Sequence, residues 1–231
     1  MGEAARRRAA AARRHSTGEI TIRDAVRGEG PRVRHLLDRH IGGEGPHDAA
    51  ERVDHPESRD DGLWIQLVAE RDGVIVGALA AGDIFGKPHI RSQPEAAAMI
   101  GRHAEVSNLV VHPDARGQRL GQRLLAEAER RYMDAGYELL SGEFVARHAH
   151  LRTYYGDAGF TVGKSGQPVV IVFGGEMISP LEPNDDAVLF WKVTRTGPTV
   201  VDFSSVSAAE GTRLVELAVR QAQGDTLTDG K

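Results

Sequence analysis

The sequence predicts a mixed α/β fold. Strand-like and helix-like segments alternate along most of the chain, an Asp-Gly pair joins two β-rich runs, and no segment repeats. The chain has 231 residues, of which 40% are hydrophobic and 27% charged. These values fit one domain with extensions. We expect a disordered basic tail over 1–18, a main domain over 19–195 and a C-terminal extension with one helix over 196–231.

The composition argues against several classes of protein. No apolar run approaches the roughly 20 residues that span a bilayer, and the absence of cysteine removes disulfides, thiolate nucleophiles and cysteine-ligated zinc. The net charge of −4 argues against general affinity for nucleic acid. The first 18 residues carry five arginines against Glu3 alone, so a transit peptide or a nucleic-acid-binding arm is the alternative to a solvated tail. We expect a cytoplasmic protein with no nucleic-acid partner and no membrane contact.

The first half of the main domain contains a strand, two helices and a hairpin. The residues EITIR alternate over 19–23, as in a half-buried strand. A helix is predicted from Pro31 to Ile41, and the polar segment 42–62 predicts a short helix and a loop. The following two β-rich runs meet at Arg71-Asp72-Gly73, which is a strong hairpin signal.

The second half alternates strands and helices. Residues 86–103 are expected to form a loop or a short helix, and an amphipathic helix is predicted over 119–136. A short helix over 148–160 should end at Gly159, and Ser207 and Glu210 have capping-box spacing before the last helix. The predicted strands cover 105–111, 138–146, 168–174 and 187–193.

The stretch VVHPDARGQRLGQRLL, from Val110 to Leu125, carries the strongest functional signal. A glycine turn between a strand and a helix exposes unpaired backbone amides, and the helix start carries a partial positive charge. Arginines on both sides of Gly117 add attraction for an anion. The pattern predicts a phosphate or pyrophosphate site. A structural turn without a ligand is the alternative.

Two motifs, EVSNLVVHPDARGQRLGQRLL and LRTYYGDAGF, together resemble the acetyl-CoA site of the GNAT superfamily of N-acetyltransferases. The resemblance covers residues 19–193 and implies a mostly antiparallel central sheet flanked by helices. It also implies that the turn amides bind the pyrophosphate of coenzyme A and that the preceding strand pairs with the pantetheine arm. Arg119 stands where the family usually has glycine. The implied coenzyme-binding residues are Leu109, Val110, Val111, Arg116, Gly117, Gln118, Arg119, Leu120, Gly121 and Gln122.

Acetyl transfer to an amine needs a base, because a lysine-like amine with a pKa of ~10.4 is protonated at neutral pH. The resemblance implies that Glu105 is this base and that Tyr155 donates a proton to the departing thiolate. A solvated carboxylate and a packing tyrosine are the alternatives. Tyr154 is expected to pack, and His148 stands where the family often has asparagine. The spacing of the histidines is not diagnostic of a metal site, so no metal is expected.

The predicted function is direct transfer of acetyl from acetyl-CoA to a primary amine on a small molecule or a protein. A coenzyme A-binding regulatory module and an acyltransferase for longer acyl-CoA are the alternatives. Seven carboxylates and two arginines lie between Gly42 and Gly62, which favours a cationic acceptor unless these charges only solvate a loop. The sequence leaves open whether the chain forms a homodimer.

Overall fold

The computed structural model describes residues 18–41, 48–55, 62–84, 101–173, 176–181, 183–184, 186–195 and 199–202. The contacts divide the chain into two compact units. The first unit comprises Met1–Ser58, Ile65–Ala80 and Asn108–Glu127, and the second unit comprises Arg59–Trp64, Ala81–Ser107 and Ala128–Lys231. The predicted basic tail and C-terminal helix lie outside the described residues, so both stay predictions.

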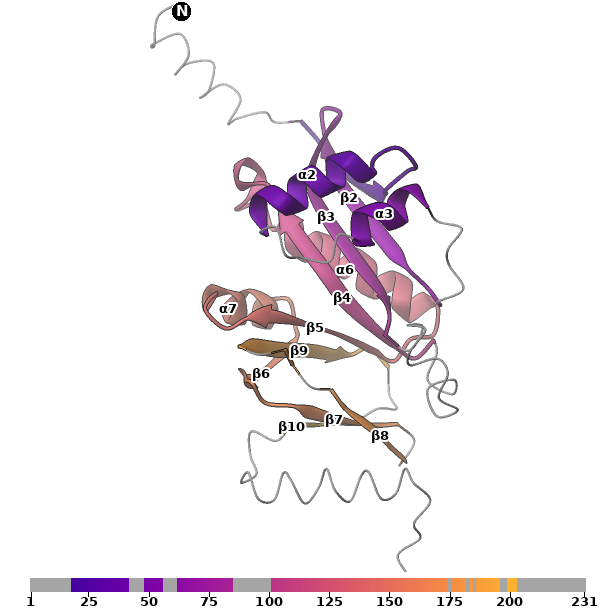
Figure 1. Cartoon of the computed structure of the whole chain (residues 1–231), viewed down its shortest axis with the longest axis vertical. Helices are drawn as coiled ribbons and strands as arrows, with labels where there is room; N and C mark the ends of the chain where they lie inside the picture. Colours follow the sequence, from indigo (N-terminus) through magenta and orange to yellow (C-terminus); the bar gives the residue numbers. More distant parts are fainter. Residues whose placement is uncertain are drawn as a thin grey trace, which may run out of the picture. The chain divides into compact units, whose positions relative to one another are not determined.

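The first unit begins with a strand that pairs with a hairpin (Figure 1). Strand β1 (Ile20–Asp24) runs antiparallel to β2 (Ile65–Arg71), from Ile20↔Arg71 to Asp24↔Leu67. The chain turns from β2 into β3 (Val74–Asp83) at Asp72 and Gly73, whose φ angles are 51° and 76°. Positive φ at both central residues is the mark of a type I′ turn, which Asp-Gly favours. The hairpin prediction is confirmed.

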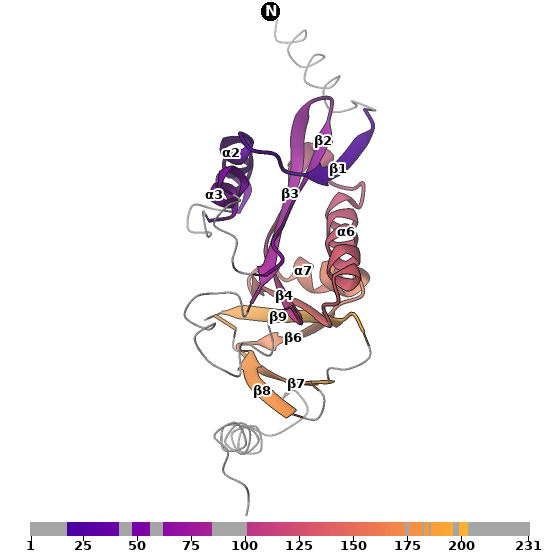
Figure 2. The same ribbon diagram turned by 90° about the vertical axis from the view of Figure 1, so that its right-hand side faces the viewer.

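Three helices cover the strands of the first unit. Helix α2 (Gly30–His40) buries Val33, Leu36 and Leu37, the spacing that predicted it, and α3 (Asp48–Asp54) follows. The start of α6 (Leu120–Asp134) buries its leucines. Figure 2 shows α2 and α3 on one face of the strands and α6 on the other. This two-sided cover explains why most of β2 and β3 is buried.

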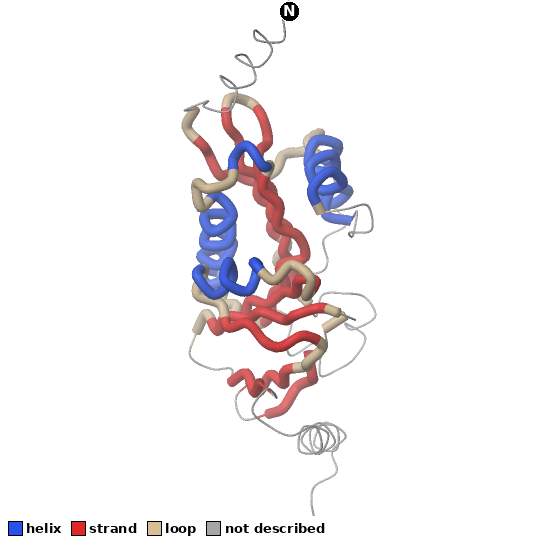
Figure 3. The backbone as a smooth tube through the Cα atoms, turned by 90° about the vertical axis from the view of Figure 1, so that its left-hand side faces the viewer, coloured by secondary structure: helices blue, strands red, loops and turns tan. Residues whose placement is uncertain are grey.

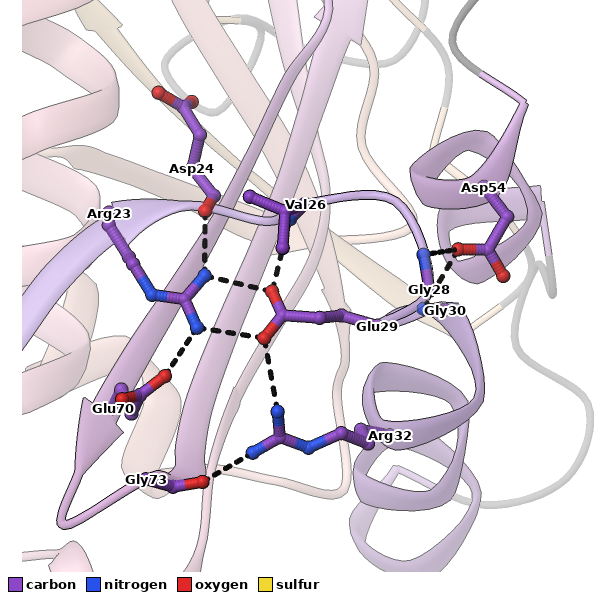
Figure 4. Close-up of polar contacts among 10 residues, drawn as sticks. All are labelled: Arg23, Asp24, Val26, Gly28, Glu29, Gly30, Arg32, Asp54, Glu70 and Gly73. Atoms are coloured by element: carbon purple, nitrogen blue, oxygen red, sulfur yellow. Dashed lines mark hydrogen bonds and ion pairs between the residues drawn. The ribbon is translucent and has the colours of Figure 1, made fainter.

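A network of charged side chains connects α2 to the strands through hydrogen bonds and ion pairs (Figure 4). The Arg23 guanidinium donates to both carboxylate oxygens of Glu29 at 2.8 Å and also to Glu70. Arg32 donates to Glu29 at 3.1 Å and to the carbonyl of Gly73 at 2.6 Å. The hydrogen bond from Arg23 lowers the pKa of Glu29 to about 2, against the opposing effect of burial. The network therefore holds β1, the hairpin and the start of α2 together.

The second unit combines the rest of a seven-stranded sheet with a small three-stranded sheet. The strand orders are β1-β2-β3-β4-β5-β9-β6 and β10-β7-β8. The β4–β5 pair is parallel, whereas β5–β9, β6–β9 and β7–β8 are antiparallel, so the predicted fold class is confirmed. Figure 3 draws the strands of both sheets in red. The elements are β4 (His103–Val111), β5 (Leu139–Val145), α7 (His150–Asp157), β6 (Thr161–Ser165), β7 (Val169–Phe173), β8 (Glu176–Leu181), β9 (Ala187–Val193) and β10 (Thr199–Asp202).

The prediction missed three of these strands. Strand β6 contains Gly163 and is largely exposed, β8 contains Pro180, and β10 has only four residues. Glycine and proline inside a short run weaken a strand pattern, and a four-residue run is too short to show an alternation. Their pairing partners, not their own residues, make these segments strands.

The two faces of β5 pack against different partners. On the face that carries Ser141, Leu139 packs with Leu189 and Trp191 of β9 and with Val169 and Ile171 of β7. We call this the Ser141 face. On the opposite face, which we call the Phe144 face, Phe144 stacks with Tyr155 of α7 at 5.6 Å between ring centroids. The small sheet and α7 therefore cover opposite sides of the same strand.

Candidate functional site

Side chains of the turn after β4 form hydrogen bonds with its backbone and with the end of the strand. His112 Nδ1 accepts a hydrogen bond from the amide of Asp114 at 3.2 Å, which caps a 3-10 turn over Pro113–Ala115. Arg116 Nε donates to the carbonyl of Val111 at 3.2 Å. The buried Ala115 anchors the turn, while residues 116–119 are exposed. The first part of the turn is therefore held in place, and residues 116–119 after it are open to solvent.

Two residues of this turn have left-handed backbone. Gly117 has φ 79° and Arg119 has φ 54°. The second value explains why glycine suits this position, because Arg119 adopts a conformation that glycine enters without strain. A Cβ placed on Gly117 would meet nothing within 4 Å, so only conformation favours glycine there.

The start of α6 supplies the donors for an anion. Helix α6 begins at Leu120, and its first helical hydrogen bond joins the amide of Arg123 to the carbonyl of Arg119 at 3.0 Å. The amides before Arg123 point out of the helix start, where a phosphate accepts hydrogen bonds. Leu120 and Gly121 are buried, which fixes the direction of the helix. The residues present therefore fit a pyrophosphate group.

Strand β4 has a register partner on its β5 side for only part of its length. The parallel register runs from His103↔Leu139 to Val106↔Gly142, and no later pair follows in the described residues of the two strands. On the other side β4 neighbours β3, and the amide of His112 donates to the carbonyl of Val76 at 2.8 Å. Leu109, Val110 and Val111 thus lie beyond the β5 register, where backbone groups remain for an extended ligand.

Asn108 is a buried polar residue of β4 that the sequence prediction did not single out. It is buried, and its side-chain oxygen Oδ1 has no hydrogen-bond partner among the residues that the structure describes. A polar residue at a buried position of an alternating apolar strand was the signal that could have found it.

Glu105 lies on the Ser141 face of the sheet. It is half-buried, and its register partner on β5 is Ser141. His103, two residues earlier on the same face, contacts Ser141 Oγ through Nε2 at 2.7 Å. Both His103 and Ser141 are 1% exposed. Glu105 is therefore half-buried, on the same face of the sheet as the buried His103–Ser141 pair.

Tyr155 lies in an aromatic cluster on the Phe144 face. Its ring stacks on Phe190 at 3.8 Å between centroids and contacts Phe144 and Phe160. Burial raises the pKa of the Tyr155 phenol above its ordinary value, and it raises the pKa of the half-buried Tyr154 to about 12. Both phenols therefore keep their protons at neutral pH. Glu105 and Tyr155 lie on opposite faces of the sheet.

The acidic segment predicted to attract an acceptor is only partly described. Asp54 accepts hydrogen bonds from the amides of Gly28 at 2.8 Å and Gly30 at 3.2 Å, so this carboxylate holds the start of α2. Glu51 forms an ion pair with Arg34 at 3.2 Å. A groove of about 490 Å³ lies between α2 and α3. Its charged and titratable lining residues are Arg34, His35, Asp38, Glu51, Asp54 and His55.

Over the described ranges, no group of three or more His, Asp or Glu side chains is placed to hold a metal ion. His148 and His150 have ring centroids 6.1 Å apart and are both exposed. Among the helices of the described residues, none is long and apolar enough to cross a bilayer.

Comparisons with known proteins agree with the fold. A model of the acetyltransferase (GNAT) family matches residues 31–160, a range that includes Glu105, the turn and Tyr155. A search of curated proteins gave no match.

Solved structures of several bacterial proteins are similar to the chain. A protein from Desulfovibrio desulfuricans described as a GNAT acetyltransferase shares 21% identity with a TM-score of 0.54, over 77% of this chain and 100% of that one. A Salmonella typhimurium protein described as an acetyltransferase, solved with its cofactor acetyl-CoA, shares 20% identity with a TM-score of 0.54, over 77% and 95%. The ribosomal-protein-S18-alanine N-acetyltransferase of Escherichia coli shares 16% identity with a TM-score of 0.51, over 77% and 96%. The likeness to these structures concerns the fold.

Proposed function

We propose that this chain, which belongs to the acetyltransferase (GNAT) family, transfers an acetyl group from acetyl-CoA to a primary amine. The observation that carries the proposal is the turn from Arg116 to Gln122, with its left-handed backbone at Gly117 and Arg119 and the helix start behind it. Acetyl-CoA supplies an acetyl group that is activated as a thioester. The similar Salmonella structure, solved with that cofactor, also supports the proposal.

The coenzyme would be held mainly by backbone groups. In the proposal, the amides of Gly117, Gln118, Arg119, Leu120, Gly121 and Gln122 donate to the pyrophosphate. The exposed side chains of Arg116 and Arg119 raise the local concentration of the anion without fixing its position. The backbone of Leu109, Val110 and Val111 pairs with the amides of the pantetheine arm, on the side of β4 that lies beyond the β5 register.

Glu105 is the proposed base. An amine with a pKa of ~10.4 must lose a proton before its lone pair can attack a carbonyl carbon. The carboxylate of Glu105 takes this proton, directly or through one water, and holds it on an oxygen atom. Glu105 is half-buried, so the water around its carboxylate is reduced compared with a fully exposed glutamate.

Tyr155 is the proposed acid. Its raised pKa keeps the phenol protonated, so the proton is present when the sulfur leaves. Because Tyr155 and Glu105 lie on opposite faces, they can serve one reaction only where the sheet is open. The β4–β5 register ends at Val106↔Gly142, so the opening begins at Ser107 and Glu143.

The acceptor is proposed to be a cationic amine on a small molecule or a protein. The S18-alanine enzyme named above acts on a protein, but its name does not select the acceptor of this chain. Asp54 also holds the start of α2 through two backbone amides, so a test of charge steering leaves this residue unchanged. The remaining carboxylates of 42–62 should raise kcat/KM for cationic amines at low salt and lose this effect at high salt. If kcat/KM for a neutral amine depended on salt as strongly as kcat/KM for a cationic amine, these charges would serve only to solvate the loop.

Two measurements test the proposed function. Coenzyme A at 100 times its dissociation constant should stabilise the fold by ~2.7 kcal/mol, read as a rise in melting temperature. Thiol release with a panel of amines should then identify the acceptor class. Binding without thiol release would favour a regulatory module, and faster release from longer acyl-CoA would favour an acyltransferase of another chain length. No melting shift at millimolar coenzyme A would overturn the proposal.

A further inference from the structure

A buried amide on β4 has no role in the mechanism described above. Asn108 is 8% exposed, and its Oδ1 atom accepts no hydrogen bond from the described part of the chain. Its neighbours on the same face of the strand are the buried apolar residues Val106 and Val110. An amide oxygen buried without a partner destabilises a protein, because it has lost its hydrogen bonds to water. An apolar residue of similar size would avoid this cost. The presence of asparagine at this position therefore points to a ligand.

The position of Asn108 indicates which ligand. It lies two residues beyond Val106, the last residue of β4 in the β5 register, and immediately before Leu109. The proposed path of the pantetheine arm begins at Leu109. That arm carries two amide N–H groups, which need acceptors once they leave water.

A second buried amide in the first unit provides a control. Gln66 is 5% exposed, and its Oε1 also accepts no hydrogen bond from the described residues. Gln66 lies on β2, which has a neighbouring strand on each side, β1 and β3. The two residues share chemistry and burial, but Asn108 alone lies beside the open side of a strand.

We propose that Asn108 is a coenzyme-binding residue whose Oδ1 accepts a hydrogen bond from an amide N–H of the pantetheine arm. This proposal rests on the proposed function, because it names the same coenzyme. The contact adds affinity for coenzyme A and makes the ligand-free chain less stable than an apolar variant. Stability and affinity should therefore respond to the same substitution with opposite signs.

The test compares Asn108→Leu with Gln66→Leu in the full chain. Melting temperature is measured without ligand, and calorimetry measures the affinities for coenzyme A and for adenosine 3′,5′-bisphosphate, which lacks the pantetheine arm. Asn108→Leu should raise the melting temperature by a few degrees and weaken coenzyme A binding about tenfold. Its affinity for the bisphosphate should not change. Gln66→Leu should leave both affinities unchanged. Asn108→Ala, which adds no bulk, serves as a second variant if leucine disturbs the fold.

Each other outcome has a distinct meaning. Unchanged affinity of Asn108→Leu for coenzyme A would overturn the role of Asn108 and leave the proposed function intact. Equal weakening of both ligands would overturn it as well, because the residue would then act through the fold. A lower melting temperature for both Asn108 variants would refute the claim that Oδ1 of Asn108 has no hydrogen-bond partner in the ligand-free protein. Failure of the wild-type chain to bind coenzyme A would overturn the proposed function itself.

Discussion

Apart from Asn108, the residues of the first unit that are proposed to bind coenzyme act through their backbone, whereas the residues proposed for catalysis in the second unit act through their side chains. At the turn, φ angles of 79° at Gly117 and 54° at Arg119 set the direction of the donors. On the sheet, Glu105 is the register partner of Ser141, and the ring of Tyr155 stacks on Phe190. We therefore expect substitutions in the two units to impair different properties of the protein. Side-chain exchanges should affect turnover in the second unit, and backbone strain should affect coenzyme affinity in the first.

The largest effect expected from this comparison is on turnover in the second unit. Glu105→Gln removes the base and keeps the shape of the side chain, so turnover should fall by roughly 10²–10⁴-fold. Coenzyme affinity should stay within a factor of about two, since the turn is untouched. The measurements are kcat from thiol release and the dissociation constant from calorimetry. A variant with unchanged turnover would show that another residue or bulk solvent takes the proton.

The next effect separates the phenol of Tyr155 from its ring. Tyr155→Phe keeps the stacking on Phe190 but removes the proton donor, so turnover should fall roughly 10²-fold while stability is retained. The raised pKa of Tyr155 predicts that wild-type turnover does not decline on the alkaline side until pH exceeds the usual phenol range. Tyr154→Phe is the matched control and should leave turnover unchanged. Equal losses in the two variants would assign Tyr155 to packing.

The charge network predicts an effect on stability in the first unit. The pKa of Glu29 is held at about 2, against 4.5 in the unfolded chain, so its ion pairs contribute up to about 3 kcal/mol at neutral pH. This contribution is fully present above pH 4.5 and is lost as pH falls toward 2. Urea unfolding of the wild type and Glu29→Gln should therefore differ most at pH 7. A difference that persists at pH 2 would mean that packing, not charge, is lost in the variant.

The smallest effect is expected at the turn itself. Gly117→Val should weaken coenzyme A binding about tenfold, because a β-branched residue resists positive φ. The variant should still fold, since a Cβ at Gly117 meets no atom within 4 Å. Arg119→Gly relieves strain at the second left-handed residue and should keep at least half of the affinity. Calorimetry measures the affinity of both variants for coenzyme A. Similar losses of affinity in the two variants would mean that the side chain of Arg119 contributes to binding.

Features set by adjacent residues were predictable from the sequence. The Asp72-Gly73 hairpin, the start of α6 and the turn at Gly117 depend on short-range conformational preferences, and the structure has all three. The family motif also marked Arg119 as a departure. Its φ of 54° is a conformation that glycine enters without strain, although the residue is arginine.

Features that join distant segments were not predictable from the sequence. Arg23 and Glu70, 47 residues apart, meet only because β1 pairs with β2. Placing Glu105 and Tyr155 on opposite faces requires the β4–β5 and β5–β9 registers, which no local pattern contains. Strand β6 likewise exists through its pairing with β9 rather than through its own residues.

Transfer of a labelled acetyl group tests the central claim most directly. The wild-type chain is incubated with acetyl-CoA labelled in the acetyl carbons and with the amine panel, and mass spectrometry follows the label. We predict a labelled N-acetyl product that accumulates one for one with free thiol, and that accumulates much more slowly with Glu105→Gln. Tight coenzyme binding without any labelled product, over the whole panel and from pH 6 to 9, would contradict the claim of catalysis.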